Sequence, residues 1–131
     1  MCYSVLIADD SFAIRQGLRE LFDHEPDFMV CGDAENGLEA IHEAQHLHPD
    51  LILLDLSMPV MNGLDAAREL KSLMPEVPVI MVSAFSEPFT EQAARSAGAK
   101  ALVSKSEPIS ILLAKARSLM PGTESPNRLT A

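Results

Sequence analysis

Five side chains that can do chemistry stand where runs of apolar residues end. Asp9 and Asp10 follow the run YSVLIA, and Asp55 ends the run DLILLD between two leucines. Ser83 and Lys105 end two later runs, VPVIMVS and ALVSK. A short apolar run bounded by turn residues predicts a buried strand, and an ionised carboxylate there costs on the order of several kcal/mol unless a cation pairs with it. Either Asp55 lies at the solvent-exposed end of its strand, or a cation lies close to it.

The residues around these positions alternate between strand-like and helix-like patterns. Apolar runs cover residues 3–9, 28–34, 50–56, 77–84 and 101–105. Apolar residues at helical spacing lie between and after these runs, and they are Ile14, Leu18, Leu21 and Phe22; Leu38, Ile41 and Ala44; Leu64, Ala67 and Met74; Phe89, Ala93 and Ala97; and Ile109, Leu112, Leu113, Ala116 and Met120. Strand followed by helix, five times over, predicts an α/β domain with a doubly wound parallel sheet that has helices on both faces.

A parallel sheet brings the carboxyl ends of its strands to one edge, where ligands bind. Asp9, Asp10 and Asp55 would repel one another at that edge, and a bound cation makes such an arrangement favourable. Three carboxylates suit octahedral Mg²⁺, which keeps several waters and binds phosphate oxygens alongside. Ser83 and Lys105 can hold the oxygens of a phosphoryl group, and an aspartate can itself form an aspartyl phosphate. The cation beside Asp55 is therefore predicted to be Mg²⁺ or Lys105.

Composition narrows the classes of function. The 131 residues predict one domain, and 19 acidic against 10 basic residues give a net charge of -9. This charge argues against direct binding of nucleic acid, because contacts with phosphates need a basic surface. No apolar run approaches the roughly 20 residues that span a bilayer, and the N-terminal residues lack the features of a signal peptide. With two cysteines and no disulfide framework expected, we predict a cytoplasmic location and no membrane contact.

The motifs that carry these residues resemble those of the receiver domain of bacterial two-component response regulators. The resemblance covers residues 4 to about 120 and rests on ADDS (8–11), LLDLSMPVMNGLD (53–65), MVSA (81–84) and SK (104–105). It implies a flavodoxin-like receiver fold with five helices and a five-stranded parallel sheet in the order 2-1-3-4-5. It also implies that the chain accepts a phosphoryl group from a sensor histidine kinase or a phosphotransfer protein.

The resemblance further implies a role for each residue at the edge of the sheet. These roles are Asp55 as phosphoacceptor; Asp9, Asp10, Asp55 and the backbone carbonyl of Ser57 around Mg²⁺; and Ser83 and Lys105 on the phosphoryl oxygens. Met58, Pro59 and Gly63 would shape the loop that follows the phosphoacceptor. The expected cofactor is therefore Mg²⁺.

Two positions depart from the family pattern. Most members carry Tyr or Phe three residues before the active-site Lys, where the ring moves when a Thr or Ser hydroxyl turns towards the phosphoryl group. Here Leu102 stands at that position, so Ser83 and Leu102 occupy the two switch positions. Without the aromatic ring, we expect switching to come mainly from residues 84–86 and the fourth helix. Many members follow the Lys with Pro, whereas Ser106 follows Lys105. The stretch VSKSEPISIL is more similar to receivers that are joined to helix-turn-helix output domains.

The domain organisation and partners follow from the same resemblance. Residues 1–121 are predicted to form the receiver domain, and residues 122–131 a disordered tail. We expect a stand-alone phosphorelay module, not a conventional enzyme, that is a monomer or a phosphorylation-dependent dimer. It would control a protein partner through the fourth helix, the fifth strand and the fifth helix. The alternative is a receiver fragment of a DNA-binding transcriptional regulator.

A rival hypothesis rests on HEAQH at residues 42–46, which matches the zinc-protease pattern H-E-x-x-H. Two histidines one helical turn apart, with Glu43 between them, could bind zinc and activate water. The apolar stripe of the predicted second helix puts His42 and His46 on its solvent side, and no second motif supplies a third ligand. We therefore predict a solvated helix face here, and a zinc metallopeptidase remains a remote alternative.

Overall fold

The computed structural model describes residues 2–84 and 88–121, with the side chains of Pro88 and Phe89 excepted. Strands and helices alternate along the chain as β1 (Tyr3–Ala8), α1 (Phe12–Asp23), β2 (Phe28–Ala34), α2 (Gly37–Leu47), β3 (Leu51–Asp55), α3 (Gly63–Leu73), β4 (Val79–Ser83), α4 (Pro88–Ser96), β5 (Ala101–Ser104) and α5 (Ile109–Leu119). Every predicted strand and helix is present. The predicted tail at residues 122–131 lies outside the described residues.

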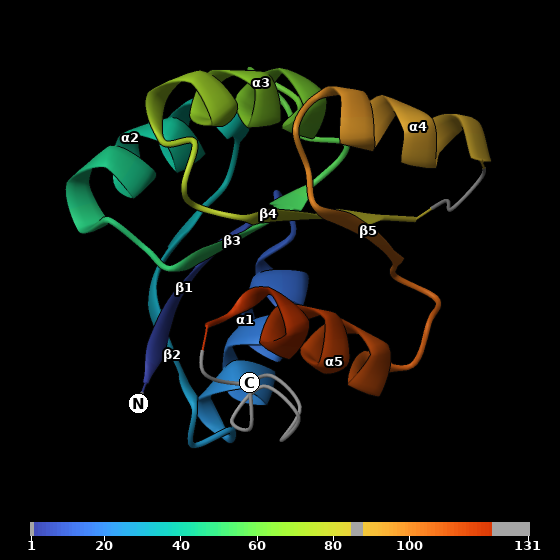
Figure 1. Ribbon diagram of the computed structural model, residues 1–131. Coiled ribbons are helices and arrows are strands. Elements are labelled where there is room, and N and C mark those ends of the chain that lie inside the picture. Colours follow the sequence, from blue (N-terminus) through green and yellow to red (C-terminus); the bar gives the residue numbers. More distant parts are fainter. Residues whose placement is uncertain (1, 85–87, 122–131) are drawn as a thin grey trace, which may run out of the picture.

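The five strands form one parallel sheet in the order β2-β1-β3-β4-β5. Helices α2, α3 and α4 cover one face of the sheet, and α1 and α5 cover the other (Figure 1). The predicted doubly wound, flavodoxin-like receiver fold is therefore confirmed. Because the strands are parallel, β1, β3, β4 and β5 all end at the same edge.

Two separate apolar layers hold the helices against the sheet. One layer packs Leu6, Ile52 and Met81 under α2, α3 and α4, and the other packs Ile7, Leu53 and Ile80 under α1 and α5. Neighbouring residues of one strand point to opposite faces, so strands covered on both sides are apolar throughout. All residues of β3 and β4 are buried, including Asp55 and Ser83.

Among the stripe residues whose side chains the structure describes, which excludes Phe89, two were predicted wrongly, Leu38 and Ile109. Both were expected to face the sheet, but they are 55% and 54% exposed. Each lies in the first turn of its helix, α2 or α5, next to the loop that connects the helix to the preceding strand. Helical periodicity gives the direction of a side chain and does not tell whether the sheet extends far enough to cover it.

Polar side chains set where three of the helices begin. The side chains of Ser11, Asn36 and Asn62 accept hydrogen bonds from backbone N–H groups in the first turns of α1, α2 and α3. Ser11 directly follows Asp9 and Asp10, so its capping hydrogen bond places the beginning of α1 beside these two aspartates. None of the helices within residues 2–84 and 88–121 is long and apolar enough to cross a membrane.

Candidate functional site

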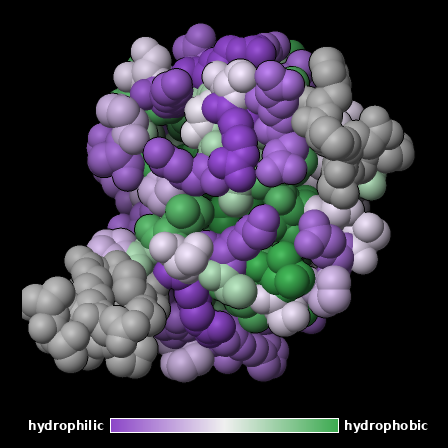
Figure 2. Space-filling view, turned by 45° about the vertical axis from the view of Figure 1, so that its right-hand side comes forward, coloured by the Kyte–Doolittle hydropathy of each residue, from purple (hydrophilic) through white to green (hydrophobic). Residues whose placement is uncertain are grey.

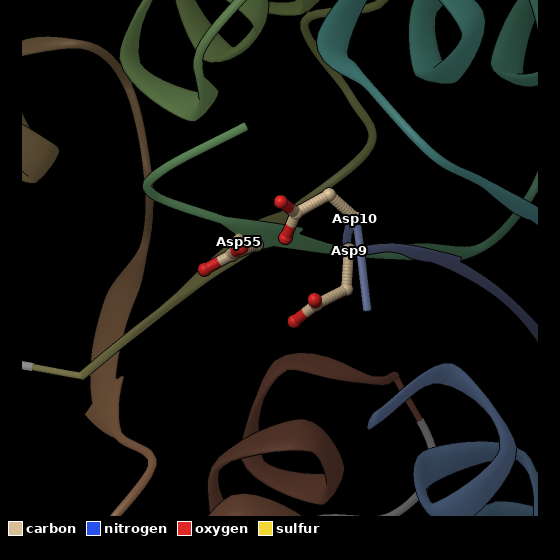
Figure 3. A group of neighbouring side chains, drawn as sticks. All are labelled: Asp9, Asp10 and Asp55. Carbon is tan, nitrogen blue, oxygen red and sulfur yellow. The ribbon is translucent and has the colours of Figure 1, made fainter. Parts of the chain in front are cut away.

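The edge where the strands end gathers Asp9, Asp10 and Asp55. One carboxylate oxygen from each lies within 4.8 Å of the others, and no other group of three potential metal-binding residues occurs in the described part of the chain. Figure 3 shows Asp9 and Asp10 leaving the end of β1 beside Asp55 of β3. Asp9 is 1% exposed and Asp55 is 4% exposed, whereas Asp10 is open to solvent.

Lys105 provides the cation that buried Asp55 requires. Its Nζ lies 3.0 Å from Oδ2 of Asp9 and 3.1 Å from Oδ1 of Asp55. The lysine follows β5, and its backbone N–H donates to the Ser83 carbonyl of β4 at 2.7 Å. One ammonium thus compensates two buried carboxylates, which leaves the cluster short of positive charge before Asp10 is counted.

The pKa values of Asp55 and Lys105 reflect this shortage of positive charge. Burial raises the pKa of Asp55 and the nearby Asp9 carboxylate raises it further, while Lys105 and the backbone of Ser57 oppose them without cancelling them. Burial alone would lower the pKa of Lys105, but the hydrogen bonds to Asp9 and Asp55 outweigh burial, and the pKa is raised. Lys105 is therefore held as a cation, and Asp55 gains from any further positive charge.

The other residues predicted from the sequence are Ser83, Ser57 and Leu102, which lie in β4, in the loop after β3, and in β5, respectively. Ser83 is the last residue of β4 and is buried, one residue beyond Val82, which pairs with Asp55 in the sheet. Ser57 is exposed in the loop after β3. Leu102 is buried in β5 beside Met81, and its carbonyl accepts a hydrogen bond from Lys115 at 3.5 Å.

The match to known proteins decides the family. Residues 5–117 match the response regulator receiver domain. This chain belongs to that family. The receiver domain is 33% identical to the response regulator domain of Thermotoga maritima CheB, with a TM-score of 0.84 over 96% of this chain and 100% of that one.

Curated relatives are longer than this receiver domain. It is 46% identical over 83 residues to a protein-glutamate methylesterase/protein-glutamine glutaminase of Pyrococcus horikoshii, covering 63% of this chain and 22% of that protein. It is 39% identical over 97 residues to an uncharacterized transcriptional regulatory protein of Bacillus subtilis, covering 74% of this chain and 45% of that protein. The chain therefore spans less than half the length of these two relatives.

The acidic cluster of the receiver domain fits the divalent cation that the family implies. Mg²⁺ prefers carboxylate oxygens and retains several waters, and the cluster offers three carboxylates, one of which opens to solvent. No histidine or cysteine belongs to the cluster, so the donor set suits a hard cation better than zinc or copper. Receiver domains bind Mg²⁺ at such an acidic pocket.

The two histidines of the HEAQH pattern are not arranged as a metal site with a third ligand in the described part of the chain. His42 and His46 are exposed on α2, with their rings stacked at 6.2 Å between centroids. Among the described residues, neither belongs to a cluster of three potential ligands. Their positions match the predicted solvated helix face.

Arg15 is part of the site and was not predicted from the sequence. Its guanidinium donates to the carbonyl of Asp9 at 2.8 Å and to the carboxylate of Asp33 at 3.2 Å. The side chain is only 11% exposed. The sole signal in the sequence is a basic residue directly after apolar Ile14 in the first helix, and arginines on helix flanks are too common to single it out.

Proposed function

We propose that this receiver domain accepts a phosphoryl group on Asp55 from a phosphohistidine of a sensor histidine kinase or phosphotransfer protein. The observation that supports this most is the setting of the Asp55 carboxylate, which lies 3.1 Å from Lys105 and in one cluster with Asp9 and Asp10. A buried carboxylate beside a lysine and a candidate Mg²⁺ site is suited to nucleophilic attack on phosphorus.

The transfer exchanges one bond to phosphorus for another. An oxygen of Asp55 attacks the phosphorus in line, an O–P bond forms, and the N–P bond of the donor phosphohistidine breaks. The electron pair of the N–P bond stays with the donor imidazole. Mg²⁺, when bound, would neutralise charge on the phosphoryl oxygens. Lys105 would meet an oxygen of the same group as a point charge, and Ser83 would offer its hydroxyl to another.

The first test is labelling with a small phosphodonor. Acetyl phosphate with Mg²⁺ should add one phosphoryl group to the wild type, as measured by intact mass, and Asp55→Asn should abolish the addition. Asp65→Asn is the matched control, because Asp65 is an exposed aspartate of α3 whose carboxylate pairs with Arg68 and not with the acidic cluster among the described residues. Labelling that persists in Asp55→Asn, or that disappears in Asp65→Asn as well, would contradict the assignment.

The metal requirement separates this function from the metallopeptidase. Asp10→Ala should weaken Mg²⁺ binding in a calorimetric titration, because it removes the solvent-facing ligand of the cluster. The double variant His42→Ala, His46→Ala should bind Mg²⁺ as the wild type does. The opposite pattern would favour the histidine pair.

We infer that the downstream partner contacts the face formed by α4, β5 and α5, with Ser83 of β4 and Leu102 of β5 at the switch positions. Residues 85 and 86 of the expected switching loop lie outside the described residues. Figure 2 shows the side of the molecule that carries these elements, where hydrophobic surface lies in the middle with hydrophilic surface above and below it. Ile109 and Ile111 of α5 are 54% and 36% exposed and supply apolar contact area. Substituting Ile111→Asp should disrupt a phosphorylation-dependent dimer or complex, as measured by light scattering with beryllofluoride, and should leave labelling of Asp55 intact.

A second candidate function is that of a receiver joined to an output domain. The coverage of the longer relatives supports it, since their names describe a methylesterase/glutaminase and a transcriptional regulator. The light-scattering measurement with beryllofluoride tests this candidate too. A receiver that remains monomeric with beryllofluoride and Mg²⁺ would argue against control through dimerisation of an output domain.

A further inference from the structure

A buried hydroxyl lies next to the active-site lysine. Ser104 is the last residue of β5 and is 4% exposed, in a strand whose other residues are Ala, Leu and Val. Its Oγ lies 2.8 Å from Oγ of Ser106 and accepts the backbone N–H of Ser106 at 3.2 Å. A buried hydroxyl is tolerated in a core when it is hydrogen-bonded, so Ser106 explains how Ser104 is accommodated.

Glu107 closes the same loop from the other side. Its Oε1 accepts the backbone N–H of Ser104 at 3.0 Å, and its own N–H donates to the Ser104 carbonyl at 3.0 Å. Residues 104–107 thus form a compact loop with four internal hydrogen-bond contacts, which we name the 104–107 clasp. Both backbone groups of Ser104 and its side chain are engaged in it.

Lys105 lies within the clasp, and the residues on either side of it are hydrogen-bonded to each other. Its N–H is bound to the Ser83 carbonyl at 2.7 Å, and its flanking residues are tied together by the Ser104–Ser106 contacts. A lysine stem has several rotatable bonds, so the position of Nζ depends on a fixed Cα at its base. The observed Nζ contacts, 3.0 Å to Asp9 and 3.1 Å to Asp55, start from a backbone held on both sides.

Ser106 also accounts for the departure from the family pattern at this position. A proline after the lysine would fix φ through its ring and would have no N–H to donate. Here the backbone N–H of Ser106 donates a hydrogen bond to Oγ of Ser104. The peptide bond between Lys105 and Ser106 is trans, as are all peptide bonds in the described chain. The clasp restrains the backbone through a side-chain hydroxyl, where proline would restrain it through covalent geometry.

We propose that Ser104, Ser106 and Glu107 are positioning residues for Lys105, and that they hold its ammonium where a phosphoryl oxygen will lie. This role rests on the proposed phosphoryl transfer to Asp55. The clasp residues act through Lys105 and do not reach the acidic cluster themselves. They should therefore govern affinity for a bound phosphoryl mimic, while affinity for Mg²⁺ alone depends on the carboxylates.

The test uses beryllofluoride, a phosphoryl mimic, and follows its binding by fluorine NMR at saturating Mg²⁺. Ser104→Ala should weaken beryllofluoride binding about five- to tenfold, the effect of losing roughly one neutral hydrogen bond. Ser104→Thr keeps the hydroxyl and should restore binding. Glu107→Ala should weaken binding as well, whereas Glu107→Gln keeps an acceptor oxygen and should bind like the wild type. Mg²⁺ affinity measured without beryllofluoride should be the same in all five proteins.

A double-mutant cycle distinguishes positioning from general loosening of the fold. Lys105→Met should weaken beryllofluoride binding, and Ser104→Ala should add nothing in the Lys105→Met background, because the residue it positions is gone. An equal loss from Ser104→Ala in both backgrounds would overturn the proposal, as would wild-type affinity in Ser104→Ala. If the wild type itself fails to bind beryllofluoride with Mg²⁺, the proposed phosphoryl transfer fails and this role falls with it.

Discussion

Gly63 lies directly against the backbone of Asp55. A Cβ at Gly63 would be 2.2 Å from the Asp55 carbonyl oxygen, closer than a carbon atom can approach without displacing the backbone. The N–H of Gly63 also donates to the carbonyl of Leu56 at 2.9 Å. The first residue of α3 therefore packs onto the end of the strand that carries the candidate phosphoacceptor, and only glycine leaves room for it.

We predict that Gly63→Ala destabilises the domain by about 1–3 kcal/mol, the usual range for overpacking, because the backbone around Asp55 must move. The matched control is Gly17→Ala in α1, where an added Cβ meets nothing within 4 Å. That substitution should stabilise the domain by about 0.5–1 kcal/mol through helix propensity. Urea unfolding of both variants measures the difference, and equal effects of the same sign would contradict the packing argument.

Mg²⁺ affinity should fall as the pH is lowered. Burial, with the Asp9 carboxylate adding to it, raises the pKa of Asp55 above the ordinary 3.8, and a proton on Asp55 competes with the metal. Affinity should be full well above the raised pKa and should be lost as the pH falls through it, by up to about tenfold per pH unit for one proton. Calorimetric titrations from neutral pH down to pH 3.8 would test this. The same profile in Asp55→Asn would mean that another group is responsible.

The same raised pKa predicts that Asp55→Asn is more stable than the wild type at neutral pH without metal. The folded state binds the Asp55 proton more tightly than the unfolded state, so its contribution to stability is present below pH 3.8 and is lost as the pH rises through the raised pKa. Asparagine removes this dependence. Thermal melts in a chelator should show a higher midpoint for Asp55→Asn at neutral pH, and a lower midpoint would show that loss of the Lys105 ion pair outweighs relief of the buried charge.

Arg117 should contribute to stability more than an ordinary surface arginine. Its guanidinium binds the carboxylates of Asp27, at 2.9 Å from Nε, and of Glu25, and it lies 5.9 Å from the centre of the Phe28 ring. Because Arg117 is 37% exposed and solvent screens the pairs, Arg117→Met should cost about 1 kcal/mol. The control Arg68→Met removes a more exposed pair with Asp65 and should cost less than about 0.5 kcal/mol.

The pH dependence gives a second check on Arg117. The hydrogen bond from Arg117 lowers the pKa of Asp27, against the effect of burial. The stability that Asp27 contributes is therefore present above pH 3.8 and is lost as the pH falls through the lowered value. The difference between wild type and Arg117→Met should shrink in acid, and a difference that does not vary with pH would assign the effect to packing alone.

Val60 holds a strained backbone conformation in the loop after β3. Its φ is 66°, in the left-handed region that β-branched residues avoid, and its side chain is 78% exposed. Val60→Asn should stabilise the domain by about 1 kcal/mol, because Asn tolerates this region and no buried contact is lost. Val60→Ala keeps most of the strain and serves as the control in the same unfolding measurement.

Most of the fold could be predicted because the strands of a doubly wound sheet are apolar throughout. The run 50–56 became β3 at Leu51–Asp55, and the run 77–84 became β4 at Val79–Ser83, with the differences confined to the ends. The edge cluster followed from the rule that parallel strands end together. Arg15 could not be predicted, because its partners are a backbone carbonyl and Asp33, 18 residues away. The 104–107 clasp was equally hidden, since it depends on a loop conformation that residue types alone do not specify.

Helix α5 runs from the edge of the sheet that carries the site to the opposite edge. The helix begins at Ile109, four residues after Lys105, and ends at Leu119, where Leu119, Met120 and Tyr3 line one pocket at the opposite edge of the sheet. Its 11 residues span about 16 Å. Arg117 ties the far end of the helix to Asp27, in the segment between α1 and β2. A displacement of the end near Lys105 would therefore require the helix to turn about this contact, or the contact to break.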